Sequence, residues 1–115
     1  MKRYILFFYL CSFQLAFAQV IVDFDCIQSY PAAILEAQFG IEDAEQDVDL
    51  YRVTYSTIGS DGMPDTASGS VALPIMDNEN FPILIYHHGT VNNRFDVPSQ
   101  GSSESTVGLT GAAYG

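Results

Sequence analysis

The sequence predicts an incomplete α/β fold in which an antiparallel hairpin is followed by one central strand. Residues 50–58 and 66–73 alternate apolar and polar side chains around a turn-forming segment, which predicts two paired, half-buried strands. Residues 83–86 are apolar without a break, which is typical of a strand covered on both faces. A short helical pattern between residues 31 and 40 supplies the α element.

Composition indicates one small packed domain and excludes two classes of partner. Of the 115 residues, 48% are hydrophobic and 13% aromatic, so a packed core is expected rather than disorder. The formal net charge is −10, and it becomes −10 − 2 = −12 if Lys2 and Arg3 are removed with the N-terminal segment. Nucleic acid and anionic membrane surfaces both require clustered Lys or Arg, so neither is expected as a partner.

Residues 1–18 have the three-part pattern of a secretory signal peptide. A basic pair opens the segment, an apolar run fills residues 4–17, and Ala16 and Ala18 place small side chains before the cleavage site. Cleavage leaves 115 − 18 = 97 residues, which divides the chain into a signal peptide, 1–18, and one domain, 19–115. We therefore expect a secreted or periplasmic protein.

Two alternative membrane attachments fit the sequence less well. The apolar run is shorter than the ~20 residues that a bilayer core needs, which argues against a transmembrane anchor. A lipoprotein requires a Cys directly after the cleavage site, and Cys11 lies too early. We thus expect no membrane anchor. Cys26 is then the one mature cysteine, which excludes a disulfide-dense mini-protein, and we expect it to be a buried small hydrophobe.

The first mature elements are a short apolar segment and a helix. Residues 20–22 suit a short strand or an extended arm. In the helix, Pro31 fits the first turn and Gly40 fits a C-terminal cap. The side chains expected on its apolar face are Ile34, Leu35 and Phe39.

An acidic segment separates the helix from the hairpin. It contains five carboxylates: Glu42, Asp43, Glu45, Asp47 and Asp49. A calcium loop is one interpretation, but the segment lacks the internal Gly and the spacing of an EF-hand and precedes a strand. We expect a solvated connector.

The hairpin and the segments after it follow from turn residues and periodicity. Residues 59–64 are dense in Gly, Asp and Pro, which predicts the turn, and Pro74 ends the second strand. Beyond the central strand, residues 91–105 are polar and predict a flexible connection. Residues 105–113 predict a weak helix or coil.

The junction after the central strand carries the functional prediction. The chain reads His87-His88-Gly89-Thr90 directly after Tyr86. The end of a central strand presents backbone N–H groups to a ligand, and Gly89 permits a close approach by substrate. In acyl-transfer hydrolases such a turn directs an N–H at the developing oxyanion.

Four segments in order resemble secreted bacterial esterases and lipases of the α/β-hydrolase family, similar to the secretory lipase group. They are Tyr51-Arg52-Val53-Thr54-Tyr55, Thr66-Ala67-Ser68-Gly69, Tyr86-His87-His88-Gly89-Thr90 and Asp96-Val97-Pro98-Ser99. The resemblance spans roughly residues 29–115 and implies the N-terminal part of that fold, in which the hairpin and central strand lead to the oxyanion turn. It implies a Ser-Asp-His triad acting on a small-molecule or lipid ester, without metal or cofactor.

The triad that the resemblance implies does not lie within this chain. The segment Gly101-Ser102-Ser103-Glu104-Ser105 begins like the nucleophile motif G-x-S-x-G, but Ser105 replaces the second Gly and no apolar strand precedes it. These serines are expected to be loop or helix-capping residues. The expectation is therefore a fragment, inactive by itself, of an enzyme that hydrolyses carboxylic esters.

The resemblance implies oxyanion-turn roles for His88, Gly89 and Thr90. His88 would orient the loop by hydrogen bonding, and the backbone N–H of Thr90, or of Val91, would be the first oxyanion donor. His87 is expected to pack against its neighbours at the strand end. Zinc would need further ligands, and the spacing to Asp96, the nearest candidate, does not support a site.

A different class of protein remains open: a small secreted, non-enzymatic, β-rich binding or adhesion module. The hairpin and acidic surface suit it, whereas the polar segment 91–115 and the continuous apolar run at 83–86 do not. Because that run expects parallel neighbours that the chain does not contain, we also predict that residues 19–115 alone are insoluble or partly disordered.

Overall fold

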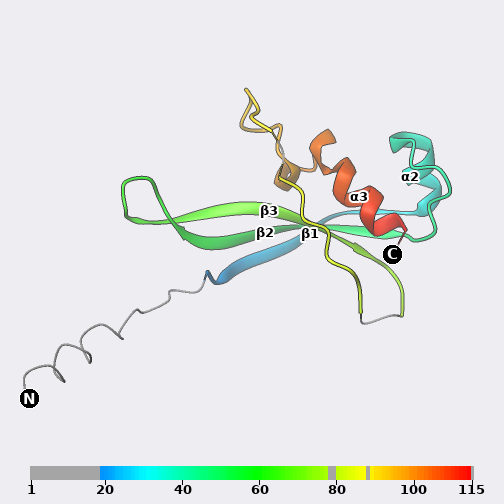
Figure 1. Ribbon diagram of the computed structural model, residues 1–115, viewed down its shortest axis with the longest axis horizontal. Coiled ribbons are helices and arrows are strands. Elements are labelled where there is room, and N and C mark those ends of the chain that lie inside the picture. The colour runs from blue at the N-terminus through cyan, green and yellow to red at the C-terminus, as the bar shows by residue number, and fades with distance from the viewer. Residues whose placement is uncertain (1–18, 78–79, 88, 115) are drawn as a thin grey trace, which may run out of the picture.

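The computed structural model describes residues 19–77, 80–87 and 89–114. Three strands, β1 (Ile21–Tyr30), β2 (Val48–Ile58) and β3 (Pro64–Pro74), form one antiparallel sheet in the order β1-β2-β3. Helices α2 (Ala32–Phe39) and α3 (Thr106–Ala113) lie on the same side of this sheet, near the start of β2 (Figure 1). Two short 3₁₀ helices, η1 (Pro98–Gln100) and η2 (Ser103–Ser105), precede α3.

The hairpin predicted from alternating side chains is confirmed. β2 and β3 pair without interruption from Val48 opposite Pro74 to Ile58 opposite Pro64. The turn is closed by a hydrogen bond from the Gly59 N–H to the Met63 carbonyl, 2.8 Å, and Gly62 has a positive φ of 78°. The turn residues therefore act as the sequence indicated.

Strand β1 is longer than the short strand or arm expected at residues 20–22. It runs for 10 residues and pairs with β2, with register irregularities between Ile21 and Asp23 and between Cys26 and Gln28. At its centre the polar residue Asp25 stands between Phe24 and Cys26. Arg52 of β2 forms an ion pair with Asp25, at 3.1 Å, across this pairing.

Helix α2 forms where it was predicted, with one difference at its start. Gly40 ends it with φ 66°, and its N–H donates to the Glu36 carbonyl at 3.1 Å. Pro31 lies before the first turn rather than in it, and its carbonyl accepts hydrogen bonds from the N–H groups of Ile34 and Leu35. Leu35 is buried, and Ile34 and Phe39 are half-buried, so the predicted apolar face is confirmed.

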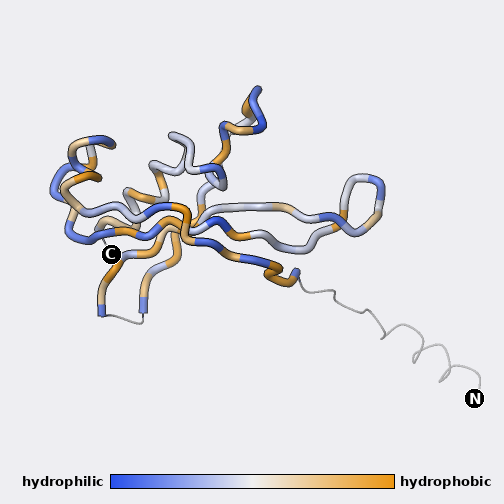
Figure 2. Tube along the Cα trace, turned by 180° about the vertical axis from the view of Figure 1, so that it is seen from behind, coloured by the Kyte–Doolittle hydropathy of each residue, from blue (hydrophilic) through white to orange (hydrophobic). Residues whose placement is uncertain are grey.

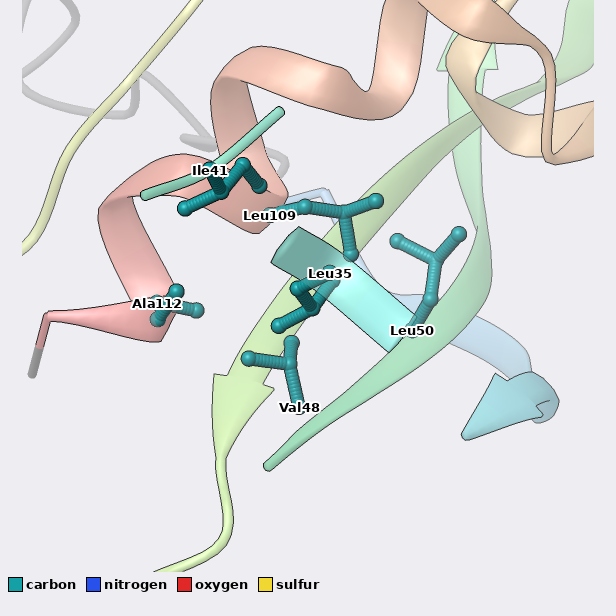
Figure 3. Close-up of a cluster of buried hydrophobic side chains, with 7 residues drawn as sticks. Leu35, Ile41, Val48, Leu50, Leu109 and Ala112 are labelled. Carbon is teal, nitrogen blue, oxygen red and sulfur yellow. The ribbon is translucent and has the colours of Figure 1, made fainter. Parts of the chain in front are cut away.

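The hydrophobic core lies where α2, α3 and the first part of β2 meet (Figure 3). Leu35 of α2, Val48 and Leu50 of β2, and Leu109 of α3 are at most 1% exposed. Its remaining buried members are Ile41, Ala112 and Ala113. Within residues 105–113, for which helix and coil were both open, Thr106–Ala113 form helix α3, whose apolar side packs on the sheet, and Ser105 ends η2.

The acidic connector between α2 and β2 is hydrogen-bonded to both helices. The Asp47 carboxylate accepts a hydrogen bond from the Ala32 N–H at 2.8 Å. The N–H groups of Glu45 and Gln46 both donate to the Ala113 carbonyl, at 2.9 and 3.0 Å. Among the residues that the structure describes, no group of three or more His, Cys, Asp or Glu is placed to hold a metal ion.

The central strand predicted at residues 83–86 is wrong for this structure. These residues belong to no strand, and Ile83, Leu84, Ile85 and Tyr86 are 88%, 65%, 72% and 47% exposed. Figure 2 shows an apolar stretch here, outside the three-stranded sheet. A central strand pairs with a strand on each edge, and among the described residues segment 83–86 pairs with none. The structure thus has a three-stranded antiparallel sheet with two helices.

Cys26 corrects a second prediction. It was expected to be buried, but it is a free, exposed thiol on β1. The core lies at α2, α3 and the start of β2, and Cys26 is not among the residues packed there. The signal peptide prediction falls on residues 1–18, which lie outside the described residues. Within the described part of the chain, no helix has the length and apolar character to cross a bilayer.

Candidate functional site

A groove follows β3 and has a volume of about 1090 Å³. One wall is residues 68–74 of β3, and another is the exposed segment 81–87. Residues 97–99 and the glycine-containing side of α3 complete the lining. β3 is an edge strand among the described residues, because its neighbour in the sheet is β2 alone.

The side chain of Leu84 in segment 81–87 lies close to Gly111 of α3. A Cβ atom built on Gly111 would lie 2.8 Å from Cδ2 of Leu84, closer than real Cβ contacts allow. On the same helix, a Cβ atom on Gly108 would lie 3.6 Å from Cβ of Ala72, an ordinary contact. Gly111 therefore lies beside one wall of the groove and Gly108 beside the other, and a Cβ atom at Gly111 would require the flexible end of the Leu84 side chain to move.

Three serine hydroxyl groups that line the groove are hydrogen-bonded inside the protein. The Ser68 and Ser99 hydroxyls lie 2.9 Å apart and share a hydrogen bond, with Ser99 only 2% exposed. The Ser105 hydroxyl donates to the Pro98 carbonyl at 3.1 Å and is also buried. These contacts fix residues 97–105 against β3 and indicate structural roles for the serines.

The serine segment forms a short 3₁₀ helix rather than a strand-to-helix turn. Ser103 and Ser105 lie in η2, and neither Ser105 nor Ser102 caps the helix that follows through its side chain. The Ser102 hydroxyl is buried, and it has no hydrogen-bond partner among the residues that the structure describes. No serine or cysteine in that part of the chain hydrogen-bonds to His87.

The structure describes only part of the predicted oxyanion turn. His88 lies outside the described residues, so its predicted role is untested. Gly89 and Thr90 are exposed and lie beyond the residues that line the groove. A Cβ atom on Gly89 would meet no other atom within 4 Å, so packing does not demand glycine here. His87, expected to pack at a strand end, is exposed at the groove instead.

Apart from His87, the described residues that line the groove have uncharged side chains. Among them are no Asp, Glu, Lys or Arg, although the chain carries a formal net charge of −10. Such a surface can bind an uncharged or apolar group, whereas an unpaired charge placed there would be desolvated unfavourably. The described residues do not bring together the paired nucleophile and base that acyl transfer requires.

In the described part of the chain, the ionisable group with a shifted pKa lies on β2, outside the groove lining. Partial desolvation, the nearby Asp49 carboxylate and then Cys26 raise the pKa of Tyr51 above its ordinary value of 10.0. The phenol ring also approaches Phe24, with ring centroids 6.4 Å apart. This shift keeps the phenol neutral and gives it no role as a base near neutral pH.

The sequence analysis did not identify the groove, although the spacing of two glycines in residues 105–113 pointed to a close contact there. Gly108 and Gly111 are three residues apart in a segment that forms a helix, so they share one side of it. A helix side without side chains indicates close approach by another segment. The partner of that side, Leu84, could not be deduced because its segment was expected to lie inside a sheet.

Two solved structures are similar to half of this chain. Both are crystal structures of the rice cell wall degrading esterase LipA from Xanthomonas oryzae, one in a ligand-bound form. The identities are 31% and 32%, each match covers 50% of this chain, and each has a TM-score of 0.43. The matched region spans 15% and 16% of the two LipA chains. No protein-family model and no curated protein matches the chain.

Proposed function

We propose that residues 19–115 are the N-terminal part of an exported serine hydrolase of the α/β-hydrolase fold, which acts on carboxylic esters. One observation carries the proposal: an antiparallel hairpin is followed by the apolar run at 83–86 and then by His87-His88-Gly89-Thr90. The observed β2–β3 pairing supports the first half of that order.

In this proposal residues 19–115 prepare a site that other residues of a longer chain complete. A serine attacks the ester carbonyl, a histidine transfers its proton, and an acidic residue orients the histidine. The backbone N–H of Thr90, or of Val91, donates to the oxyanion that forms on the carbonyl oxygen. Strands paired with residues 83–86 would hold this turn in place, and the described residues contain none.

The experiment compares backbone and side-chain substitutions at the turn. The complete reading frame that contains these residues is expressed, and hydrolysis of p-nitrophenyl esters is measured. Thr90→Pro removes the N–H donor, and a drop in kcat of about 10²–10³ is expected with little change in KM. Thr90→Ala keeps the N–H and serves as the matched control. If Val91 is the donor, Val91→Pro shows the loss instead.

The outcomes separate failure of folding from failure of the proposal. Thermal unfolding of each proline variant must stay cooperative for its kinetics to count. An unchanged kcat in both folded proline variants removes the oxyanion role. Absence of ester hydrolysis in the complete wild-type chain removes the hydrolase proposal and favours the binding or adhesion module.

A further inference from the structure

Cleavage of the predicted signal peptide creates a new N-terminus with a reactive side chain. The small side chains of Ala16 and Ala18 put the cut between Ala18 and Gln19, so Gln19 becomes the first residue of the exported chain. Before the cut, the backbone nitrogen of Gln19 belongs to a peptide bond and is not nucleophilic. After the cut, it is a free α-amine on the same residue as the side-chain amide.

These two groups can react with each other without another residue. The uncharged α-amine attacks Cδ of the side-chain amide, so that a bond from the α-nitrogen to Cδ forms and the bond from Cδ to Nε2 breaks. The proton that the amine loses goes to the departing nitrogen, which leaves as ammonia. The product is pyroglutamate, a five-membered lactam. Because the nucleophile and the carbonyl belong to one residue, proximity favours this ring closure.

The structure exposes Gln19 and fixes the residue that follows it. Gln19 is exposed and precedes β1. The Val20 N–H donates to the Ser56 hydroxyl at 3.1 Å, and the Val20 carbonyl accepts a hydrogen bond from the Ser56 N–H at 2.9 Å. The lactam ring contains atoms of Gln19 alone, so neither hydrogen bond has to break when the ring closes.

We infer that Gln19 is a modification site: once the chain is cut behind Ala18, Gln19 cyclises to pyroglutamate and blocks the N-terminus of the exported protein. This inference rests on the export that the proposed function includes. It is independent of ester hydrolysis and of the groove along β3.

The lactam protects the first contact between β1 and β2. Chain termini are preferred sites of proteolysis unless a sheet or helix holds them. Aminopeptidases act on a free α-amine, which the lactam lacks. Removal of Gln19 and then Val20 would delete both hydrogen bonds to Ser56 and shorten the pairing of the two strands from its end.

The experiment measures the mass of the exported protein. The complete reading frame is expressed with its own residues 1–18 in a bacterial host, and the intact mass of the exported product is taken before digestion. We expect the mass of the chain that begins at Gln19, less one ammonia. Trypsin then cuts behind Arg52, and fragmentation of peptide 19–52 should locate the loss at residue 19. Edman degradation of the undigested product should give no sequence.

Gln19→Asn is the matched control. It keeps a side-chain amide at the new N-terminus, but the side chain is one methylene shorter, so the same attack would close a strained four-membered ring. The exported variant should therefore keep its full mass. An aminopeptidase should remove its first residue and leave the wild-type chain intact, and equal resistance of the two chains would overturn the protective role.

The remaining outcomes separate the modification from export. A product that begins at Gln19 with its full mass, and gives Gln in the first Edman cycle, overturns the inference and leaves export standing. A product that begins at another residue overturns both the inference and the predicted cleavage. An ammonia loss of equal extent in Gln19→Asn would locate the reaction elsewhere and likewise overturn the inference.

Discussion

The helix-covered end of the sheet and the segment after β3 contain equally apolar side chains in opposite surroundings. Leu109 of α3 is fully buried in the core, whereas Ile83 is 88% exposed. Leu109 meets α2 and β2, which the chain supplies nearby, while Ile83 has no strand beside it among the described residues. An apolar pattern therefore predicts a need for burial, and only a facing element elsewhere in the chain satisfies it.

The largest expected effect tests this contrast directly. Leu109→Ala removes a fully buried side chain and should lower the free energy of unfolding by about 2–5 kcal/mol, from lost burial and the cavity left behind. Ile83→Ala, at an exposed position, should change it by less than about 0.5 kcal/mol. Urea denaturation of both variants measures the difference. Equal destabilisation would mean that residues 83–86 are buried in solution.

The sequence predicted the helix-covered end of the sheet better than the segment after β3. The hairpin, α2 and the Gly40 cap depend on contacts between neighbouring segments, and their patterns are sufficient to predict them. The length of β1 was missed because alternating Asp23 and Asp25 suggested an exposed arm. Residues 83–86 were assigned to a sheet whose other strands the described residues lack. The turn at Gly89 and Thr90 depends on that strand, so its geometry could not be predicted either.

A smaller effect on stability is expected from the hydrogen bond between the Ser68 and Ser99 hydroxyls, which joins β3 to residues 97–105. Ser68→Ala leaves the Ser99 hydroxyl, which is 2% exposed, without its partner, and should cost about 1–3 kcal/mol of stability. Ser99→Ala leaves the exposed Ser68 hydroxyl free to bond water, so about 0.5–1.5 kcal/mol is expected. Denaturation midpoints in the reverse order would show that this contact is not formed.

The glycine at the end of α2 provides a test within the covered region. Gly40 has φ 66°, so Gly40→Ala forces an L-residue into the left-handed region and should cost about 1–2 kcal/mol. Gly69 on β3 is the control, because a Cβ atom there meets nothing within 4 Å and strand glycines are less favourable than alanine by ~0.5–1 kcal/mol. Gly69→Ala should therefore be neutral or stabilising. A thermal scan of both variants, with no loss for Gly40→Ala, would contradict the observed cap.

The smallest expected effect is electrostatic and concerns Tyr51 on β2. Desolvation first, then Asp49 and Cys26, raise the pKa of Tyr51 above 10.0 in the folded state. Above pH 10 the unfolded chain therefore loses this proton before the folded chain does, and the associated stability is lost as pH rises through the folded pKa. Asp49→Asn should lower the pKa of Tyr51 toward 10.0 but not fully to it, because the desolvation remains. Tyrosinate absorbance, with Tyr51→Phe subtracted to isolate this phenol, measures the shift. If Asp49→Asn left the titration unchanged, Asp49 would not act on Tyr51, and desolvation would be the main cause of the raised pKa.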